Sequence, residues 1–229
     1  MLTYEEQSTL HARSNAIWHD DGAVVITEGV HSDRVVIVRS GWCKVTAIKA
    51  DRPVLLRLYR PGDLLGIAAA LTGTLPAETV TVTGRWGLHA LSLHARSFTD
   101  FLRHAPNASA ALHRLQLWRL EEADRLRTIR AYPTAAQRLA GLLAELCRPE
   151  NDPHHHRDGT VLVPAFDTAL SQEDLGNWIG DSRKTVGRAL AQLRDLGLAR
   201  SGLPHRIRIT APDRLHDYVA AADAGRLLS

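Results

Sequence analysis

The stretch "LSQEDLGNWIGDSRKTVGRAL", residues 170–190, has the pattern of two short helices separated by a glycine turn. Ser171 is followed three residues later by Asp174, which is the spacing of a capping box, so the first helix is expected to begin at Ser171 and to end near Ile179. Gly180 follows, and glycine readily adopts the left-handed backbone of a helix C-terminus. The two helices are therefore expected to meet across a tight turn.

The second helix is expected to begin after Ser182, which can cap it, and to carry one apolar and one basic side. At 100° per residue the apolar side consists of Val186, Ala189, Leu190 and Leu193, and the opposite side of Arg183, Lys184, Gly187 and Arg188. This is the helix-turn-helix pattern, in which the start of the second helix enters the major groove of DNA. An ordinary helical hairpin with a solvated basic face has the same pattern.

Two short strands are expected after this helix, over residues 198–201 and 206–210. In the second strand Ile207 and Ile209 alternate with arginines, as in a strand with one apolar and one charged face. A β-hairpin beside a helix-turn-helix is the "wing" of a winged helix, here with cations on one face.

Positive charge is concentrated in this part of the sequence. Residues 182–208 include seven Lys or Arg and one acid, whereas the whole chain has a formal net charge of +3, so the remainder is net acidic. A polyanion would dock where the cations gather, and one basic patch on a modestly charged chain favours specific binding to double-stranded DNA.

The length and composition are those of a globular chain. At 229 residues it can form two domains, and 45% of its residues are hydrophobic. The start "MLTYEEQSTL" lacks the features of a signal peptide, and no apolar run approaches the roughly 18 residues that span a bilayer, so a cytoplasmic protein without a membrane partner is expected. Cys43 and Cys147 form no C-x-x-C pair and are interpreted as core or edge thiols.

Short β-type runs separated by Gly and Asp turns extend from Ala23 to about Leu93. The runs are "AVVI", "RVVIV", "CKVTAI", "VLLRLY", "TVTVT" and "LHALSL". Their regular spacing favours an antiparallel sandwich or jelly roll. The predicted fold class is therefore α+β, with an N-terminal antiparallel β jelly roll, a long dimerisation helix and a C-terminal winged helix-turn-helix. The expected domains are residues 1–96, residues 97–132 for the long helix and hinge, and residues 133–229.

The long helix follows a helical pattern that starts near Ser97 and has a break or kink at Pro106. From there a heptad-like stripe is interpreted as the seam of a homodimer, although packing on the chain's own sandwich is the alternative. The residues of the stripe are Ala108, Leu112, Leu115, Leu126 and Ile129. Tyr132-Pro133 ends this helix and is interpreted as a hinge.

A further helix is expected at residues 134–146, followed by a polar loop and the strand "TVLVPA". The loop contains His154–His156, and no metal site is expected there because no Cys or carboxylate stands at ligand spacing.

With these motifs placed, the sequence resembles the cyclic-AMP receptor protein and fumarate-nitrate reduction regulator (CRP/FNR) family of bacterial transcription regulators over nearly its whole length. The resemblance rests on "VVIVRSGWCKV" and "RPGDLLG" in the β part, on "QRLAGLLAEL", and above all on "SRKTVGRAL", which is close to the family's Ser-Arg-x-Thr-Val-x-Arg recognition helix. It implies a cyclic-nucleotide-binding-like N-terminal domain and a homodimer that binds a near-palindromic DNA site. It also places the loop of residues 150–159 where some relatives touch RNA polymerase, although the composition equally suits a solvated loop.

The resemblance implies that Ser182 and Thr185 hold phosphates while Arg183 and Arg188 read bases. Arginine independently suits bidentate contact with guanine. The best-known relatives carry Glu where this chain has Lys184, so their half-site preference does not carry over. The expected DNA contacts are Ser171, Gln172, Ser182, Arg183, Lys184, Thr185, Arg188, Arg206 and Arg208.

The effector site departs from the family pattern. Members that bind cyclic AMP have Glu after the Gly of the turn and an Arg-Ser pair about ten residues later, whereas here Gly66 is followed by Ile67 and the later pair is Pro76-Ala77. Their Thr-Ser pair on the long helix is matched by Ala123-Asp124. Loss of the Arg removes the fixed charge for the phosphate, so cyclic AMP is not expected in the familiar mode.

The candidate effector pocket therefore consists of Gly66, Ile67, Pro76, Ala77, Arg119, Ala123 and Asp124. Either it accepts a small molecule of unknown identity, with Arg119 and Asp124 as polar anchors, or it is vestigial and these two are ordinary surface charges. No certain cofactor is implied, and the N-terminal Cys cluster of the oxygen-sensing members is absent from the sequence.

Three other functions are weighed against the regulator. A metal-dependent β-sandwich enzyme is disfavoured because the common catalytic and nucleotide motifs are missing and no His-x-His stands near a carboxylate. An architectural DNA protein would bind with steep salt dependence and little sequence preference. A nucleotide-sensing module could instead use the helix-turn-helix to contact a protein. We expect a regulator and no enzyme.

Overall fold

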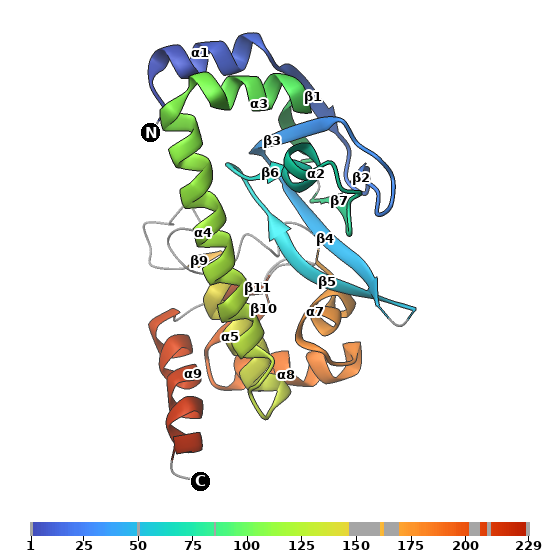
Figure 1. Ribbon diagram of the computed structural model, residues 1–229. Coiled ribbons are helices and arrows are strands. Elements are labelled where there is room, and N and C mark those ends of the chain that lie inside the picture. The colour runs from blue at the N-terminus through green and yellow to red at the C-terminus, as the bar shows by residue number, and fades with distance from the viewer. Residues whose placement is uncertain are drawn as a thin grey trace. The chain divides into compact units, whose positions relative to one another are not determined.

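A computed structural model describes residues 2–49, 51–84, 86–146, 161–162, 170–201, 207–209 and 212–227 (Figure 1). The contacts within the chain divide it into two compact units, Met1–Glu121 and Glu122–Ser229. The long helix α4 (Pro106–Ile129) contributes its first part to one unit and its last part to the other. Each unit is described by itself below.

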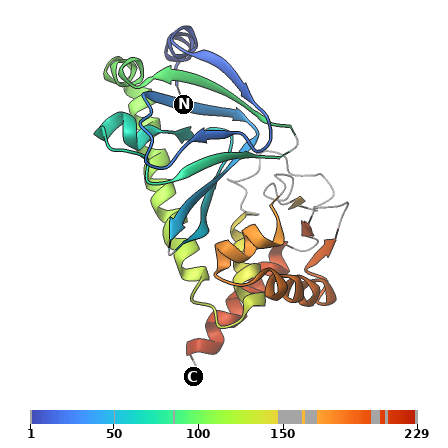
Figure 2. The same ribbon diagram turned by 90° about the vertical axis from the view of Figure 1, so that its right-hand side faces the viewer.

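The described strands of the first unit form two antiparallel sheets (Figure 2). The strands are β1 (Asn15–His19), β2 (Val24–Ile26), β3 (Arg34–Ser40), β4 (Trp42–Lys49), β5 (Arg52–Tyr59), β6 (Leu64–Leu65), β7 (Thr79–Thr83) and β8 (Leu88–His94). One sheet has the order β1-β8-β3-β6 and the other β2-β7-β4-β5. Each run that was interpreted as a strand between Ala23 and Leu93 lies in one of these strands, so the antiparallel β part is confirmed.

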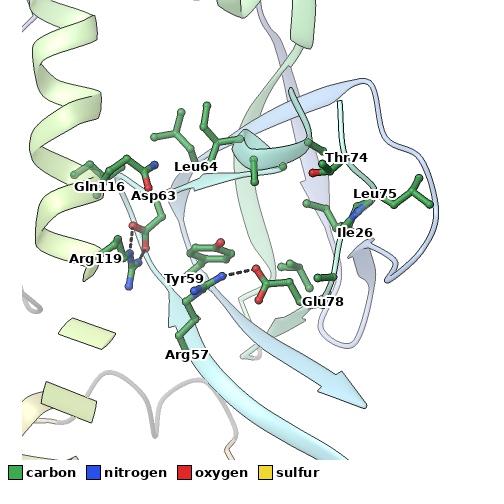
Figure 3. A pocket seen from close by; sticks show the side chains of 18 residues that line it. Ile26, Arg57, Tyr59, Asp63, Leu64, Thr74, Leu75, Glu78, Gln116 and Arg119 are labelled. Atoms are coloured by element: carbon green, nitrogen blue, oxygen red, sulfur yellow. Dashed lines mark hydrogen bonds and ion pairs between the residues drawn. The ribbon is translucent and has the colours of Figure 1, made fainter. Parts of the chain in front are cut away.

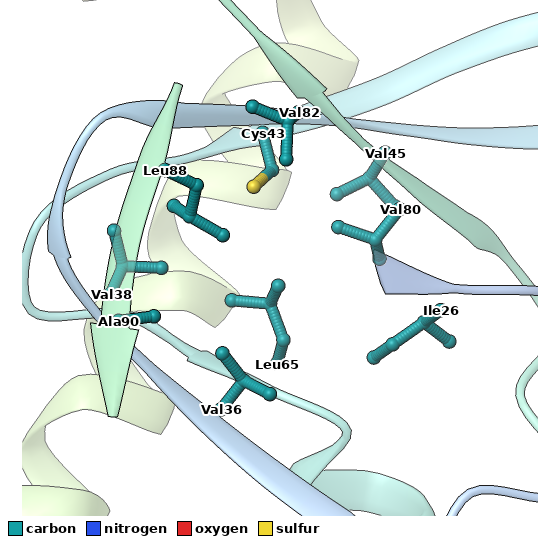
Figure 4. Close-up of a cluster of buried hydrophobic side chains, with 10 residues drawn as sticks. All are labelled: Ile26, Val36, Val38, Cys43, Val45, Leu65, Val80, Val82, Leu88 and Ala90. Atoms are coloured by element: carbon teal, nitrogen blue, oxygen red, sulfur yellow. The ribbon is translucent and has the colours of Figure 1, made fainter. Parts of the chain in front are cut away.

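The inward side chains of the two sheets form one apolar core (Figure 4). Alternate residues of a strand point to opposite faces, and in β4 Cys43, Val45 and Ala47 are accordingly buried. Cys43 is a free thiol, and burial raises its pKa to about 12, with a smaller contribution from the charge of Asp63. Cys43 is therefore a protonated core residue, as expected, whereas Cys147 lies outside the described residues.

The helices of the first unit are α1 (Tyr4–Ala12), α2 (Ile67–Thr72), α3 (Ala95–His104) and the start of α4. The predicted break falls between α3 and α4, and Pro106 takes the first position of α4, where its missing N–H costs nothing. Part of the α4 stripe packs on the chain's own β part, which was the alternative, and the use of α4 as a dimer seam stays a prediction. Leu112 is buried in a cluster with Val35 and Phe98, and Ala108 in another beside α3, so these two residues of the stripe pack within the first unit.

The second unit is built around α5 (Ala135–Leu146), whose residues from Leu139 onward are all buried. Its other described elements are β9 (Val161–Leu162), α7 (Gln172–Ile179), α8 (Arg183–Asp195), β10 (Ala199–Ser201), β11 (Ile207–Ile209) and α9 (Pro212–Leu227). α5 contacts α7, α8 and α9, and β10, β11 and β9 pair as an antiparallel sheet. These elements confirm the predicted C-terminal winged helix-turn-helix and, with the β part, the α+β fold class.

Glu6 links α1 to the start of α4. Its carboxylate accepts hydrogen bonds from the backbone N–H groups of Thr3 at 2.8 Å and Asn107 at 2.9 Å. Burial raises the pKa of the Glu6 carboxyl, but the N–H groups of Thr3, Asn107 and Ala108 together lower it more, so the net change is downward. The charged form of Glu6 therefore stabilises the folded chain.

Glu6→Gln is expected to lower the free energy of unfolding at neutral pH and to have a smaller effect in acid. Because the pKa of Glu6 is lower in the folded than in the unfolded chain, its stabilisation is complete above the ordinary value of 4.5 and is lost as the pH falls through the folded value. Urea unfolding from neutral pH down to about pH 3 measures this. Glu5→Gln, at an exposed position of the same turn, is the control. If the difference in free energy of unfolding between the wild type and Glu6→Gln did not change with pH, the stabilising role of the Glu6 charge would be refuted.

Candidate DNA-binding site and effector cavity

The turn between α7 and α8 is capped as the sequence predicts. The Ser171 hydroxyl accepts a hydrogen bond from the Asp174 N–H at 3.0 Å, and the Asp174 carboxylate accepts one from the Ser171 N–H at 2.9 Å. Gly180 ends α7 with φ +77°, and the Ser182 hydroxyl accepts from the Thr185 N–H at 3.2 Å. The Ser171 and Ser182 hydroxyls thereby each satisfy one of the backbone N–H groups that a helix N-terminus leaves without an intrahelical partner.

Gly176 allows the turn to lie against α7. The Asp181 N–H donates to the Gly176 carbonyl at 2.8 Å, and a Cβ atom at Gly176 would lie 2.5 Å from the Asp181 carbonyl oxygen. No side chain larger than hydrogen fits without a backbone shift. This glycine therefore determines how closely α8 follows α7.

Arg138 of α5 joins the turn to the segment that precedes α5. Its Nε and Nη2 atoms donate to one oxygen of Asp181 at 3.1 and 2.6 Å, and its Nη1 donates to the Tyr132 carbonyl at 2.6 Å. Both side chains of the ion pair are 18% exposed. Arg130 adds a hydrogen bond from its Nε to the Trp178 carbonyl at 3.1 Å, so the predicted hinge at Tyr132-Pro133 is bound to the helix-turn-helix.

The first turns of α8 present cations to solvent. Arg183, Lys184 and Arg188 are exposed, whereas the expected apolar face is buried at Val186, Ala189 and Leu193. Cations at the N-terminus of a helix, where free N–H groups and the helix dipole also favour anions, form a surface suited to phosphate.

The other expected DNA contacts lie around the same end of α8, as far as they are described. Ser171, Gln172 and Ser182 are exposed, and the hydroxyl of the half-buried Thr185 lies 2.9 Å from that of Ser182. A Cβ at Gly187 would lie 3.3 Å from the Gln172 amide oxygen, which is the end of a flexible side chain. Arg206 lies outside the described residues, and Arg208 is placed in β11 by its backbone.

A cavity of about 260 Å³ lies in the first unit beside α2 and α4 (Figure 3). Of the expected pocket residues, Gly66, Ile67, Pro76, Ala77 and Arg119 line it. Ala123 and Asp124 do not: both are exposed in the second unit, where Asp124 pairs with Arg127 at 2.7 Å. Within one chain, Asp124 is therefore not a polar anchor of this cavity, because it lies beyond the part of α4 that lines it.

One wall of the cavity carries a buried ion pair between Asp63 and Arg119. The Arg119 Nε donates to Asp63 at 3.1 Å, its Nη2 donates to the other oxygen, and the Arg60 N–H donates to Asp63 at 2.7 Å. Burial raises the pKa of Asp63 more than Arg119 and these hydrogen bonds lower it. Asp63 is 3% exposed, so this pair is part of the structure of the wall.

A second ion pair, between Arg57 and Glu78, lies across the Tyr59 ring from the first (Figure 3). The Arg57 and Arg119 guanidinium carbons are each 5.4 Å from the centre of that ring. Burial lowers the pKa of Arg57, but Tyr59 and Glu78 raise it more, so the guanidinium stays charged. Both arginines of the cavity are thus neutralised by carboxylates of the same chain.

Four residues of the cavity wall were not predicted from the sequence: Arg57, Tyr59, Asp63 and Glu78. Arg57 interrupts an apolar strand, and the face of the sheet to which its side chain belongs depends on a β-bulge. Val45 pairs with Arg57 and the next residue, Thr46, pairs with Leu55, so β5 has one residue more than β4 at this point. Directly opposed residues share a face of the sheet, which places Arg57 on the face of the buried Val45. The one available signal was a lone arginine within "VLLRLY".

Within the described part of the chain, no group of three or more His, Cys, Asp or Glu side chains is placed to hold a metal ion. His154–His156 are not among those residues. A search of the same residues finds no helix with the length and apolar character needed to span a membrane.

Comparison with known proteins decides the family. The cyclic nucleotide-binding domain model matches residues 17–105, and the Crp-like helix-turn-helix domain model matches residues 137–218. The chain belongs to the CRP/FNR family. It is therefore a DNA-binding transcription regulator, of a family that is not enzymatic.

Curated relatives resemble this CRP/FNR regulator over most of their length. It is 26% identical over 181 residues to the CRP-like cAMP-activated global transcriptional regulator of Mycobacterium tuberculosis, covering 78% of this chain and 77% of the relative. It is 25% identical over 205 residues to the transcriptional activator protein FnrL of Cereibacter sphaeroides, covering 89% and 80%.

Solved structures support the fold. The c-di-GMP responsive global regulator CLP of Xanthomonas campestris matches with a TM-score of 0.71 and 19% identity over 90% of this chain and 99% of that one. A CooA variant from Carboxydothermus hydrogenoformans matches with a TM-score of 0.71 and 17% identity over 93% and 90%. At these identities the likeness concerns the fold alone.

Gly176→Ala is expected to destabilise the second unit. The clash with the Asp181 carbonyl should cost about 1 to 3 kcal/mol, offset by about 1 kcal/mol of helix propensity, and urea unfolding measures the net loss. Gly187→Ala is the matched control, because its nearest neighbour is the end of the flexible Gln172 side chain. That variant should be neutral or more stable by up to about 1 kcal/mol, and equal losses in both would refute the role of Gly176.

Proposed function

We propose that this CRP/FNR regulator acts as a homodimer that places two copies of α8 in successive major grooves of a near-palindromic site. The observation that supports this most directly is the exposed basic start of α8, with Arg183, Lys184 and Arg188 held in position by a capped, clamped turn. Half-site centres are expected about one helical turn apart.

The residues at the start of α8 divide into two roles in this proposal. Ser182 and Thr185, whose hydroxyls lie at the capped N-terminus, bind phosphates and set the register. Arg183 and Arg188 read guanine by bidentate contact, and Lys184 binds guanine or phosphate. Arg206 and Arg208 of the wing, together with Ser171 and Gln172, contact the DNA backbone.

The proposed dimer surface is the part of α4 that its own unit leaves uncovered. Leu117 is 62% exposed and Leu120 is 60% exposed, and their spacing of three residues places them on one face of the helix. Burial of such a side chain is worth about 1.5 to 3 kcal/mol, so two per chain across a symmetric seam contribute substantially to association.

We infer that cyclic AMP is not the effector in the familiar mode. Ile67 and Pro76-Ala77 stand where family members that bind this nucleotide have a Glu and an Arg-Ser pair, so the polar groups of the familiar site are missing. A different small molecule is proposed as the effector. RNA polymerase is proposed as a further partner through residues 150–159, which lie outside the described part of the chain.

Arg183→Ala and Arg188→Ala are each expected to relax base choice at one position of each half-site, at a cost of about 1 to 3 kcal/mol for the preferred base. Selection of genomic fragments by the purified protein, followed by titration of the enriched site and its single-base variants, measures this. Arg194→Ala removes the same charge from the other end of α8 and should leave base choice unchanged.

The same selection tests the proposed function itself. Enrichment of one inverted repeat supports it, whereas fragments bound without sequence preference would favour an architectural protein. Arg206→Ala should weaken binding to all sequences alike. If it instead relaxed base choice as Arg183→Ala does, the assigned roles would be wrong.

Leu117→Glu combined with Leu120→Glu is expected to shift the protein from dimer to monomer, because a symmetric seam would then bury two pairs of like charges. Sedimentation equilibrium measures the change in mass, and DNA affinity should fall with it. Leu71→Glu is the matched control, since Leu71 is 52% exposed on α2. If the double variant stayed dimeric, the dimer interface would not include Leu117 and Leu120.

A further inference from the structure

Arg57 uses only one of the two donors on the side of its guanidinium that faces Glu78. Its Nη2 donates to the Glu78 carboxylate, whereas its Nε is buried and has no hydrogen-bond partner. Arg119 and Arg138 each use both Nε and Nη2 on a carboxylate. A buried donor without an acceptor is costly, so the Nε of Arg57 indicates a place for an acceptor that the chain itself does not supply.

The donors of Arg57 belong to the cavity. Arg57, Tyr59 and Glu78 all line it together with Thr74 and Leu75, and Figure 3 shows the Arg57–Glu78 pair below those two residues. The side chains of Arg57 and Glu78 are 33% and 25% exposed, in contrast to 12% and 3% for Arg119 and Asp63. Of the two pairs, the one with Arg57 is therefore more accessible to a ligand.

We propose that Glu78 is an internal competitor for Arg57, so that this carboxylate determines which anions the cavity accepts. An anion with two oxygens on one centre, a carboxylate or a phosphate, binds Nε and Nη2 of Arg57 together and displaces Glu78. The apolar wall formed by Ile26, Ile67 and Val80 then holds the rest of such an organic anion. This inference rests on the proposal that the cavity is the effector site.

The competition has two consequences for selectivity. An anion that accepts a hydrogen bond only from Nη2 replaces the bond to Glu78 without adding another. An anion that also accepts from Nε satisfies a buried donor that is otherwise unpaired, and so binds more favourably. The displaced Glu78 carboxylate also repels a second negative charge nearby. The cavity thus favours singly charged, two-oxygen groups over diffuse or multiply charged ones.

The test follows the Arg57 Nε–H resonance of the ¹⁵N-labelled full-length protein while inorganic phosphate is titrated at constant ionic strength and mildly acidic pH, where most of the phosphate is singly charged. Arg57→Lys removes this resonance and so assigns it. In Glu78→Gln, which keeps the size of the side chain and removes its charge, half-saturation should need on the order of tenfold less phosphate than in the wild type. Glu78→Ala should behave likewise if Glu78→Gln is poorly folded.

Glu5→Gln, at an exposed acidic position, should titrate like the wild type and controls for net charge. If phosphate half-saturates Glu78→Gln and Glu78→Ala at the wild-type concentration, the proposal is overturned. DNA binding by the same preparations separates the two proposals. Wild-type protein that binds DNA without sequence preference refutes the proposed function, whereas a phosphate titration that is unchanged in the Glu78 variants refutes only the role of Glu78.

Discussion

The buried carboxylate of Asp63 holds three parts of the first unit together. Its side chain accepts hydrogen bonds from Arg60 in the turn after β5 and from Arg119 on α4, and its backbone carbonyl accepts from the Val38 N–H of β3 at 2.9 Å. Removal of one partner of such a pair leaves a buried charge without compensation, which is more costly than the pair is favourable. The position of α4 against the β part, and with it one wall of the cavity, depends on this residue.

The elements that a local pattern determines were predictable from the sequence. The capping box of Ser171 and Asp174, the turn at Gly180 and the alternating strands follow from rules that act over a few residues. Short elements without such signals were missed, among them α1, β1 and the two-residue β6. The C-terminal α9 was missed as well, since its apolar residues have no marked helical stripe.

The face of α4 could not be assigned from its sequence, because an apolar stripe is the same whether it packs on its own unit or on a second copy. Leu112 proved to be covered by Phe98, and Leu117 and Leu120 remain exposed. The polar wall of the cavity could not be predicted either, because it also depends on contacts between residues that are distant in the sequence. Arg57 and Glu78 are 21 residues apart, and only the bulge in β5 and the pairing of β4 with both β5 and β7 bring them together.

The Arg138 side chain has a consequence for how the second unit can move. It binds the Tyr132 carbonyl on one side and Asp181 on the other. The Ile129 side chain lies close to the backbone of α5, because a Cβ atom at Gly141 would be 3.2 Å from its Cγ1 atom. Rotation about the backbone at Tyr132-Pro133 would break these contacts, so they oppose movement of α8 relative to the end of α4. A conformational change that keeps these contacts therefore displaces the end of α4 and the basic start of α8 together.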